Sequence, residues 1–135
     1  MVEYYVIESF GVHHPADHAN STCYGHFESD GGTYEVWMKY QTGVITFPQY
    51  WAVRTKRRVG GTITTGNFFA AWEAAGLPLG DHDEMIIGVE GQWGSGQATL
   101  TAGVLPTTTV VESATPTTRT NVPTRTNTCT AVIGI

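Results

Sequence analysis

Short runs of β-branched and aromatic residues recur through the first hundred residues, and turn-forming residues interrupt them. Such runs predict β-strands, because branched and aromatic side chains pack well on a pleated surface. The predicted strands are residues 2–8, 33–40, 44–54, 57–64, 84–90 and 97–101. Turns rich in Gly, Pro and Asp are predicted at residues 14–17, 29–32, 60–61 and 94–96. This pattern argues against a helical bundle or a coiled coil.

One segment departs from the strand pattern. Residues 67–75 are rich in Ala, Asn67 is a possible N-cap, and Gly76 is placed to end a helix. Phe68, Phe69 and Trp72 fall at helical spacing, so we expect the helix to pack on the back of a sheet. The sequence therefore predicts an all-β fold, a mostly antiparallel β-sandwich with one short α-helix.

Charge and motif content exclude several classes of function. Only 14% of the 135 residues are charged, and the formal net charge of −5 provides no basic face for nucleic acid. The apolar runs are too short to span a bilayer, and no secretory signal is recognised before the first strand. The chain also has no Gly-rich phosphate loop, no G-x-S-x-G motif and no C-x-x-C pair.

The composition changes near residue 103. Beyond it the chain is rich in Thr, contains Pro and has no aromatic residue, so it cannot bury enough apolar surface to offset its own ordering. We expect residues 1–102 to form the folded domain and residues 103–135 to be a linker or disordered tail. Pairing of Cys23 with Cys129 stays open, since one lies in a predicted loop and the other in the tail.

Two glutamates inside predicted strands, Glu3 and Glu90, are the strongest candidates for catalysis. Strand interiors disfavour Glu, and a partly buried carboxylate has the environment that acid–base catalysis uses. Strand alternation places Glu3 with Tyr5 on one face, and Gln49 with Trp51 on one face of another strand. Two carboxylates across a cleft are what glycoside hydrolysis requires. The alternative is that both are solvated glutamates on edge strands.

Other polar and aromatic residues have less specific interpretations. His13, His14 and His18, with Asp17, fit no compact zinc spacing, so no metal site is predicted. The acids next to turns and the basic run after residue 53 are expected to be solvated; they are Glu8, Glu28, Asp30, Asp83, Arg54, Lys56, Arg57 and Arg58. The many aromatic residues suit stacking on sugar rings, although ordinary sheet packing accounts for at least half of them.

Several motifs follow one another along residues 2–101. The first is Val2-Glu3-Tyr4-Tyr5-Val6-Ile7-Glu8-Ser9-Phe10-Gly11. The later ones are Ser29-Asp30-Gly31-Gly32-Thr33-Tyr34, Gln49-Tyr50-Trp51-Ala52-Val53-Arg54, Arg58-Val59-Gly60-Gly61-Thr62, residues 64–72, residues 75–80 and Val89-Glu90-Gly91. In this order they closely resemble glycoside hydrolase family 11, the endo-1,4-beta-xylanases.

The resemblance implies a jelly-roll β-sandwich with a cleft for xylan, and retaining hydrolysis of internal β-1,4-xylosidic bonds without a cofactor. Glu3 matches the nucleophile and Glu90 the general acid/base. Tyr5 matches the cleft tyrosine beside the nucleophile, and Gln49 matches a glutamine that contacts substrate. The resemblance also implies a secreted monomer that acts on xylan or xylo-oligosaccharides and has no nucleic acid or membrane partner.

The chain departs from the family pattern in several places. It enters the family's domain near the middle, so the N-terminal half is absent, and we expect the chain as written to fold poorly and have little activity. Residues 37–47 are several residues too short for the family's thumb hairpin. Glu84 and Gln92 stand where aromatic residues are expected, and Glu84 could raise the pKa of Glu90 by like-charge repulsion. The alternative function is a non-catalytic xylan-binding protein or a degenerate fragment.

Overall fold

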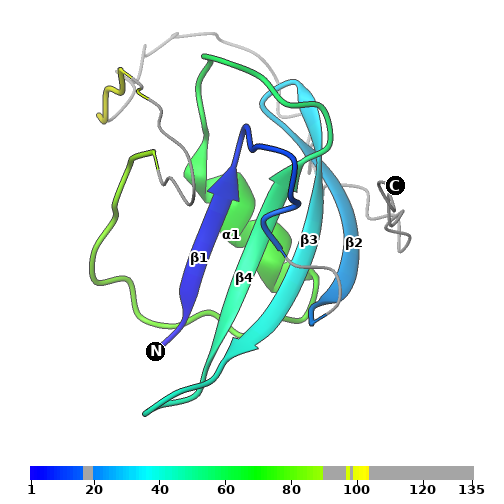
Figure 1. The fold of residues 1–135 in the computed structure, drawn as a ribbon, viewed down its shortest axis with the longest axis vertical. Coiled ribbons are helices and arrows are strands. Elements are labelled where there is room, and N and C mark those ends of the chain that lie inside the picture. The colour runs from blue at the N-terminus through cyan, green and yellow to red at the C-terminus, as the bar shows by residue number, and fades with distance from the viewer. Residues whose placement is uncertain (17–19, 90–96, 98, 104–135) are drawn as a thin grey trace, which may run out of the picture. The chain divides into compact units, whose positions relative to one another are not determined.

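The computed structural model describes residues 1–16, 20–89, 97 and 99–103. In this part of the chain one sheet is formed by β1 (Glu3–Ile7), β2 (Thr22–Ser29), β3 (Gly32–Gln41) and β4 (Phe47–Arg54). The strand order is β1-β4-β3-β2 (Figure 1). β3 pairs antiparallel with both β2 and β4, whereas β1 runs parallel to β4. The parallel pair sets the beginning of the chain beside a strand from its middle.

A two-residue turn joins β2 to β3. Asp30 and Gly31 have positive φ angles of 49° and 70°, as a type I′ turn requires. The predicted turn at residues 29–32 is thus confirmed, but the strand before it was not predicted. In β2 the pairing register shifts at Cys23 and Gly25, and Gly25 has a φ of 104°. A bulged glycine breaks the alternation by which a strand is recognised in a sequence.

Helix α1 (Thr65–Ala74) lies against one face of the sheet (Figure 1). The predicted helix and its position are confirmed, although the residue at the N-cap is Thr64 and not Asn67. The buried residues of α1 form a core with residues of β2, β3 and β4. This cluster is Phe27, Tyr34, Val36, Tyr50, Ala52, Phe68, Ala71, Trp72 and Leu77. Val2, Tyr4 and Val6 of the β1 region pack against that cluster. The odd-numbered residues of β1 therefore lie on the face away from the helix.

Three predicted strands are wrong within the described residues. Residues 57–64 contain Gly60 and Gly61 with φ angles of 82° and 119°, which a strand does not adopt. The described residues from 82 to 103 belong to a second compact unit and contain no helix or strand. Residues 84–89 alternate as a strand would, but a strand forms only when a neighbour pairs with its backbone. The mostly β fold with one short helix is nevertheless confirmed.

The tail predicted at residues 103–135 lies outside the described residues except for Gly103, and Cys129 lies outside them as well. The domain boundary therefore stays a prediction. Cys23 is disulfide-bonded, and its partner does not lie among the described residues. Within the described residues no helix is long and apolar enough to cross a membrane.

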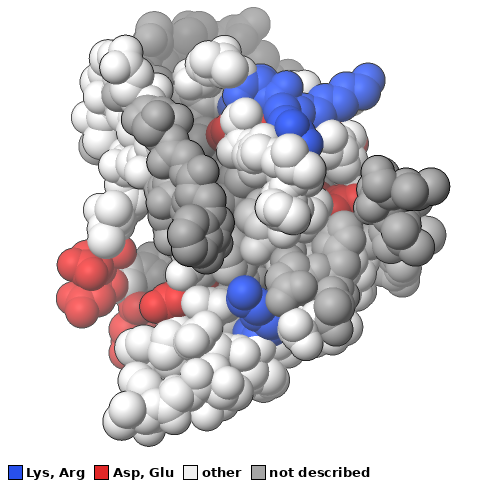
Figure 2. Space-filling model, viewed as in Figure 1, with Lys and Arg blue, Asp and Glu red and all other residues white. Residues whose placement is uncertain are grey.

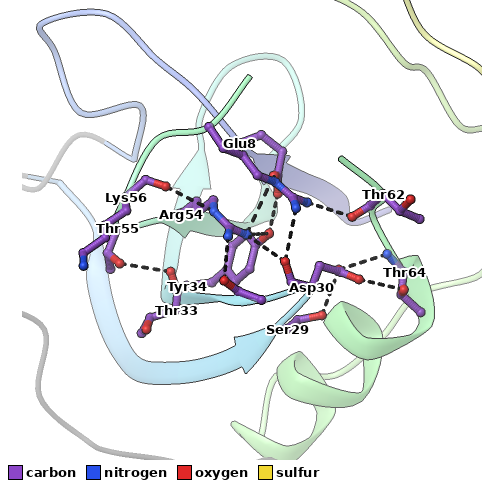
Figure 3. Close-up of polar contacts among 12 residues, drawn as sticks. Glu8, Ser29, Asp30, Thr33, Tyr34, Arg54, Thr55, Lys56, Thr62 and Thr64 are labelled. Atoms are coloured by element: carbon purple, nitrogen blue, oxygen red, sulfur yellow. Dashed lines mark hydrogen bonds and ion pairs between the residues drawn. The ribbon is translucent and has the colours of Figure 1, made fainter. Parts of the chain in front are cut away.

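A network of charged side chains ties β1, β3 and β4 together where β1 ends (Figure 3). Glu8 accepts hydrogen bonds from the Tyr34 hydroxyl and from the Arg58 guanidinium. Arg54 is only 7% exposed, and its guanidinium donates to the Tyr34 hydroxyl at 2.7 Å and to the Gly31 carbonyl at 3.0 Å. Burial raises the pKa of Tyr34 to about 12, and the bond to Glu8 acts in the same direction. Neither Glu8 nor Arg54 is solvated as the sequence predicted.

Asp30 extends this network to the beginning of α1. Its carboxylate accepts hydrogen bonds from the backbone N–H and the hydroxyl of Thr64, at 3.0 and 2.7 Å, and from the Ser29 hydroxyl at 2.9 Å. Burial opposes ionisation of Asp30, but these bonds and the charge of Arg58 outweigh it and lower the pKa. The expectation of a solvated Asp30 is therefore wrong, whereas Glu28 and Asp83 are exposed as predicted.

Candidate functional site

Glu3, Tyr5 and Gln49 meet on the sheet face opposite α1. Glu3 pairs in register with Gln49, and Tyr5 pairs with Trp51. Because paired residues of adjacent strands point to the same side, the four side chains share one face. The shared faces predicted from strand alternation are confirmed, and the structure adds that the two strands are direct neighbours.

Two donors hold one oxygen of the Glu3 carboxylate. The Tyr5 hydroxyl donates to Oε2 of Glu3 at 2.7 Å, and Nε2 of Gln49 donates to the same oxygen at 2.6 Å. Nε2 of Gln49 also lies 3.3 Å from the Tyr5 hydroxyl, so that the three side chains form one hydrogen-bonded network. Among the described residues, Oε1 of Glu3 has no hydrogen-bond partner. The carboxylate is thus fixed through one of its two oxygens, Oε2.

An aromatic stack adjoins this network. The rings of Tyr5 and Trp51 are parallel, with centroids 4.0 Å apart and an interplanar angle of 8°. Nζ of Lys39 lies 5.0 Å from the centroid of the Trp51 ring. Tyr5 and Lys39 come from the two strands that flank β4, so the indole lies between a ring and a cation. This arrangement fixes the Tyr5 side chain and, through its hydroxyl, the orientation of Glu3.

A groove of about 480 Å³ opens beside Glu3. Its floor includes Glu3, Tyr5 and Gln49, and the hairpin between β3 and β4 supplies the other lining residues, namely Gln41, Thr42, Gly43, Val44, Ile45 and Phe47. Figure 2 shows this side of the molecule, with mostly uncharged residues over the hairpin end of the sheet. The sequence analysis did not identify the hairpin residues as part of the site. Strand alternation could have found Phe47, which lies two residues before Gln49 on the same strand, whereas Gln41 joins the site only through its pairing with Phe47.

The second predicted catalytic residue, Glu90, lies outside the described residues. Glu84 is described and exposed, but its predicted effect on Glu90 stays a prediction for the same reason. Of the histidine group considered for a metal, Asp17 and His18 also lie outside. In the described part of the chain no three His, Cys, Asp or Glu side chains are grouped so that they could hold a metal ion.

A second polar cluster lies on the same face, around Glu35 of β3. Its carboxylate is within 3.3 Å of Nε2 of His14 and 3.6 Å of Nε2 of His26, and Nε1 of Trp37 donates to it at 3.0 Å. Burial opposes ionisation of Glu35, but the hydrogen bonds from His14 and Trp37 and the two histidines' charge outweigh it and lower the pKa. His14 is thus a partner of a carboxylate that the sequence analysis did not single out.

This cluster predicts a loss of stability in acid. Because the folded-state pKa of Glu35 lies below its ordinary value of 4.5, its contribution is complete above pH 4.5 and is lost as the pH falls through the folded-state pKa. We expect Glu35→Gln to be less stable than the wild type by about 1 to 2 kcal/mol at pH 6, with the difference shrinking towards pH 3. Urea unfolding at several pH values measures this, and a difference independent of pH would contradict it.

Comparisons with known proteins agree on one family. The model of the family described as "Glycosyl hydrolases family 11" matches residues 1–101. "Probable endo-1,4-beta-xylanase B" of Aspergillus clavatus is 46% identical over 107 residues, which are 75% of this chain and 48% of that protein. "Ethylene-inducing xylanase 1" of Botryotinia fuckeliana is 42% identical over 109 residues, which are 76% of this chain and 38% of that protein.

The structural comparison gives the same result. An endo-1,4-beta-xylanase of Trichoderma reesei aligns with a TM-score of 0.52 and 39% sequence identity, over 58% of this chain and 46% of that chain. The family 11 xylanases among the structural neighbours have a β-jelly-roll fold. The chain spans about half the length of the curated relatives it matches, or less.

Proposed function

Because the chain belongs to glycosyl hydrolase family 11, we propose that the protein is an endo-1,4-beta-xylanase that cleaves internal bonds of xylan with retention of configuration. Glu3 is the nucleophile and Glu90 the general acid and base. Tyr5 and Gln49 orient Glu3 and contact the substrate. The observation that carries the proposal is the Glu3 carboxylate, held through Oε2 by Tyr5 and Gln49 at 2.7 and 2.6 Å with Oε1 unpaired among the described residues.

The reaction has two steps, and each needs both glutamates. In the first, an oxygen of Glu3 bonds to the anomeric carbon while Glu90 protonates the departing oxygen, so the glycosidic bond breaks and a glycosyl ester remains on Glu3. In the second, Glu90 takes a proton from water, the water oxygen bonds to the anomeric carbon, and Glu3 leaves as a carboxylate. The role of Glu90 rests on its motif, Val89-Glu90-Gly91. The proposed chemistry needs no cofactor.

The proposal extends to the setting in which the protein acts. Its substrate is xylan or a xylo-oligosaccharide, and it works as an extracellular monomer. The fungal origin of the relatives and their names as xylanases support a role in polysaccharide degradation.

Covalent trapping tests the nucleophile directly. An activated 2-deoxy-2-fluoro-xylobioside slows the second step and should leave one fluoroxylobiosyl group bound to Glu3. Peptide mass spectrometry locates the label, both in this chain and in a fusion that adds the N-terminal segment of the Aspergillus clavatus relative. Glu73→Gln, which removes an exposed helix carboxylate, should label like the wild type. A label on any other carboxylate would refute the assignment.

A second candidate function is xylan binding without hydrolysis. The observation in its favour is the hairpin wall of the groove, where the side chains of Val44 and Ile45 are largely exposed and do not close over Glu3. Affinity electrophoresis in a xylan gel separates the two functions. Retardation without release of reducing sugars, in the chain and in the fusion, would favour binding alone.

A further inference from the structure

Lys39 places a cation on the sheet face on which the groove opens, in line with Glu3. Lys39 of β3 is in register with Gln49 of β4, and Gln49 is in register with Glu3 of β1. The three side chains therefore form one row across three strands. At the usual strand spacing of ~4.8 Å, the Cα atoms of Lys39 and Glu3 lie about 10 Å apart, a separation on the scale of a sugar residue and its substituent.

Within the described residues, Lys39 has no carboxylate within 4.0 Å, and its Nζ lies over the face of the Trp51 ring, 5.0 Å from the ring centroid. Glu35 lies on the same face but is already paired with His14 and His26. Figure 2 shows the basic side chains in two places, one group at the upper edge and a separate one over the lower half of the sheet.

A half-buried ammonium with no carboxylate within 4.0 Å among the described residues is less well compensated than one in a close ion pair. Hydroxyl groups can accept its hydrogen bonds, but they do not compensate its charge. A carboxylate accepts these hydrogen bonds and also compensates the charge, and such charge-assisted hydrogen bonds are stronger than neutral ones. Contact with an aromatic face leaves the ammonium protons of Lys39 available to such a ligand.

We infer that Lys39 binds the carboxylate of a uronic acid side group on the xylan chain, so that the groove prefers acidic xylan over unsubstituted xylan. The inference rests on the proposed function, because it places a xylan backbone along the row that ends at Glu3. Lys39 then selects the substrate and takes no part in bond cleavage.

The test measures the binding of two ligands by isothermal titration calorimetry to the full chain carrying Glu3→Gln, which cannot cleave them and serves as the reference protein for the variants below. One ligand is xylohexaose, and the other is a xylohexaose that carries a single glucuronic acid side group. We expect the acidic ligand to bind about fivefold more tightly at low salt, as one partly exposed ion pair allows. This preference should fall when sodium chloride is raised, because salt screens a solvent-accessible pair.

Three variants identify the residue responsible. Lys39→Met removes the charge but keeps an unbranched apolar side chain over Trp51, and it should bring the ratio of the two affinities close to one. Lys39→Arg should keep the preference. Lys56→Met removes a charge from an exposed residue after β4 and should leave the ratio as in the reference protein.

The outcomes separate this inference from the proposed function. Binding of xylohexaose with no preference for the acidic ligand would overturn the inference alone. A preference retained in Lys39→Met, or lost in Lys56→Met, would also overturn it. Failure to bind either ligand, in the chain and in its fusion with the N-terminal segment of the Aspergillus clavatus relative, would overturn both. If Lys39→Met does not fold, the ratio for the reference protein and its salt dependence still decide.

Discussion

Glu3→Gln should reduce the rate of xylan hydrolysis by a factor on the order of 10⁴ or more. The amide cannot form the glycosyl ester, so the two-step path is closed, and losses of this size are typical of removing a nucleophile. The fold should survive, because the amide oxygen of Gln can accept the same two hydrogen bonds from Tyr5 and Gln49 that Oε2 accepts now. Release of reducing sugars measures the rate.

Two comparisons show whether the loss comes from chemistry. Glu73→Gln removes an exposed carboxylate from α1 and should keep the wild-type rate. Glu3→Ala opens the space that the carboxylate occupied, and azide should then attack an activated aryl β-xyloside from that side and give the α-xylosyl azide. Appearance of this product would show that Glu3 lies on the side of the sugar ring from which the nucleophile attacks.

Retention of more than about a tenth of the rate in Glu3→Gln would contradict the nucleophile assignment. The same assay on the fusion with the N-terminal segment of the Aspergillus clavatus relative is informative where the chain alone is slow, since the chain spans about half of that relative. A difference between Glu3→Gln and the wild type should then be visible above background.

The part of the site that could be predicted depends on strand geometry. Side chains two residues apart in a strand share a face whatever the strand pairs with, so grouping Glu3 with Tyr5 and Gln49 with Trp51 required no knowledge of topology. That these two pairs lie next to each other on adjacent strands could not be predicted in the same way. β1 lies parallel to β4, and the bond from Gln49 to Glu3 joins residues 46 positions apart. No local pattern fixes such a pairing.

The errors also have physical causes. Strand β2 was missed because its bulge at Gly25 interrupts alternation, and the partners of Glu8 and Arg54 become visible only once strands distant in sequence are placed together. Lys39 illustrates the same limit. Its sequence context is that of an ordinary strand lysine, and only the register with Gln49 and the contact with Trp51 place it on the sheet face where the groove opens.

The network around Glu8 should contribute strongly to stability, since its charges are largely withdrawn from water. The side chain of Glu8 is 18% exposed and those of Arg54 and Arg58 are 8% and 23% exposed. Removing one charged partner from such a group leaves the remaining charges without a counter-charge, which costs about 3–5 kcal/mol in fully buried pairs. Because Glu8 and Arg58 keep some contact with water, we expect Glu8→Gln to lower the free energy of unfolding by about 2 to 3 kcal/mol.

Urea unfolding measures this loss, and a double-mutant cycle assigns it to the network. Arg58→Met should also destabilise the protein, and the double variant Glu8→Gln with Arg58→Met should cost less than the sum of the two, because each single change already breaks the pair. Glu73→Gln should change the free energy of unfolding by less than about 0.5 kcal/mol. Additive effects in the cycle would mean that Glu8 acts on stability without Arg58, and the Tyr34 hydroxyl, which also donates to Glu8, would then be the partner to test with Tyr34→Phe.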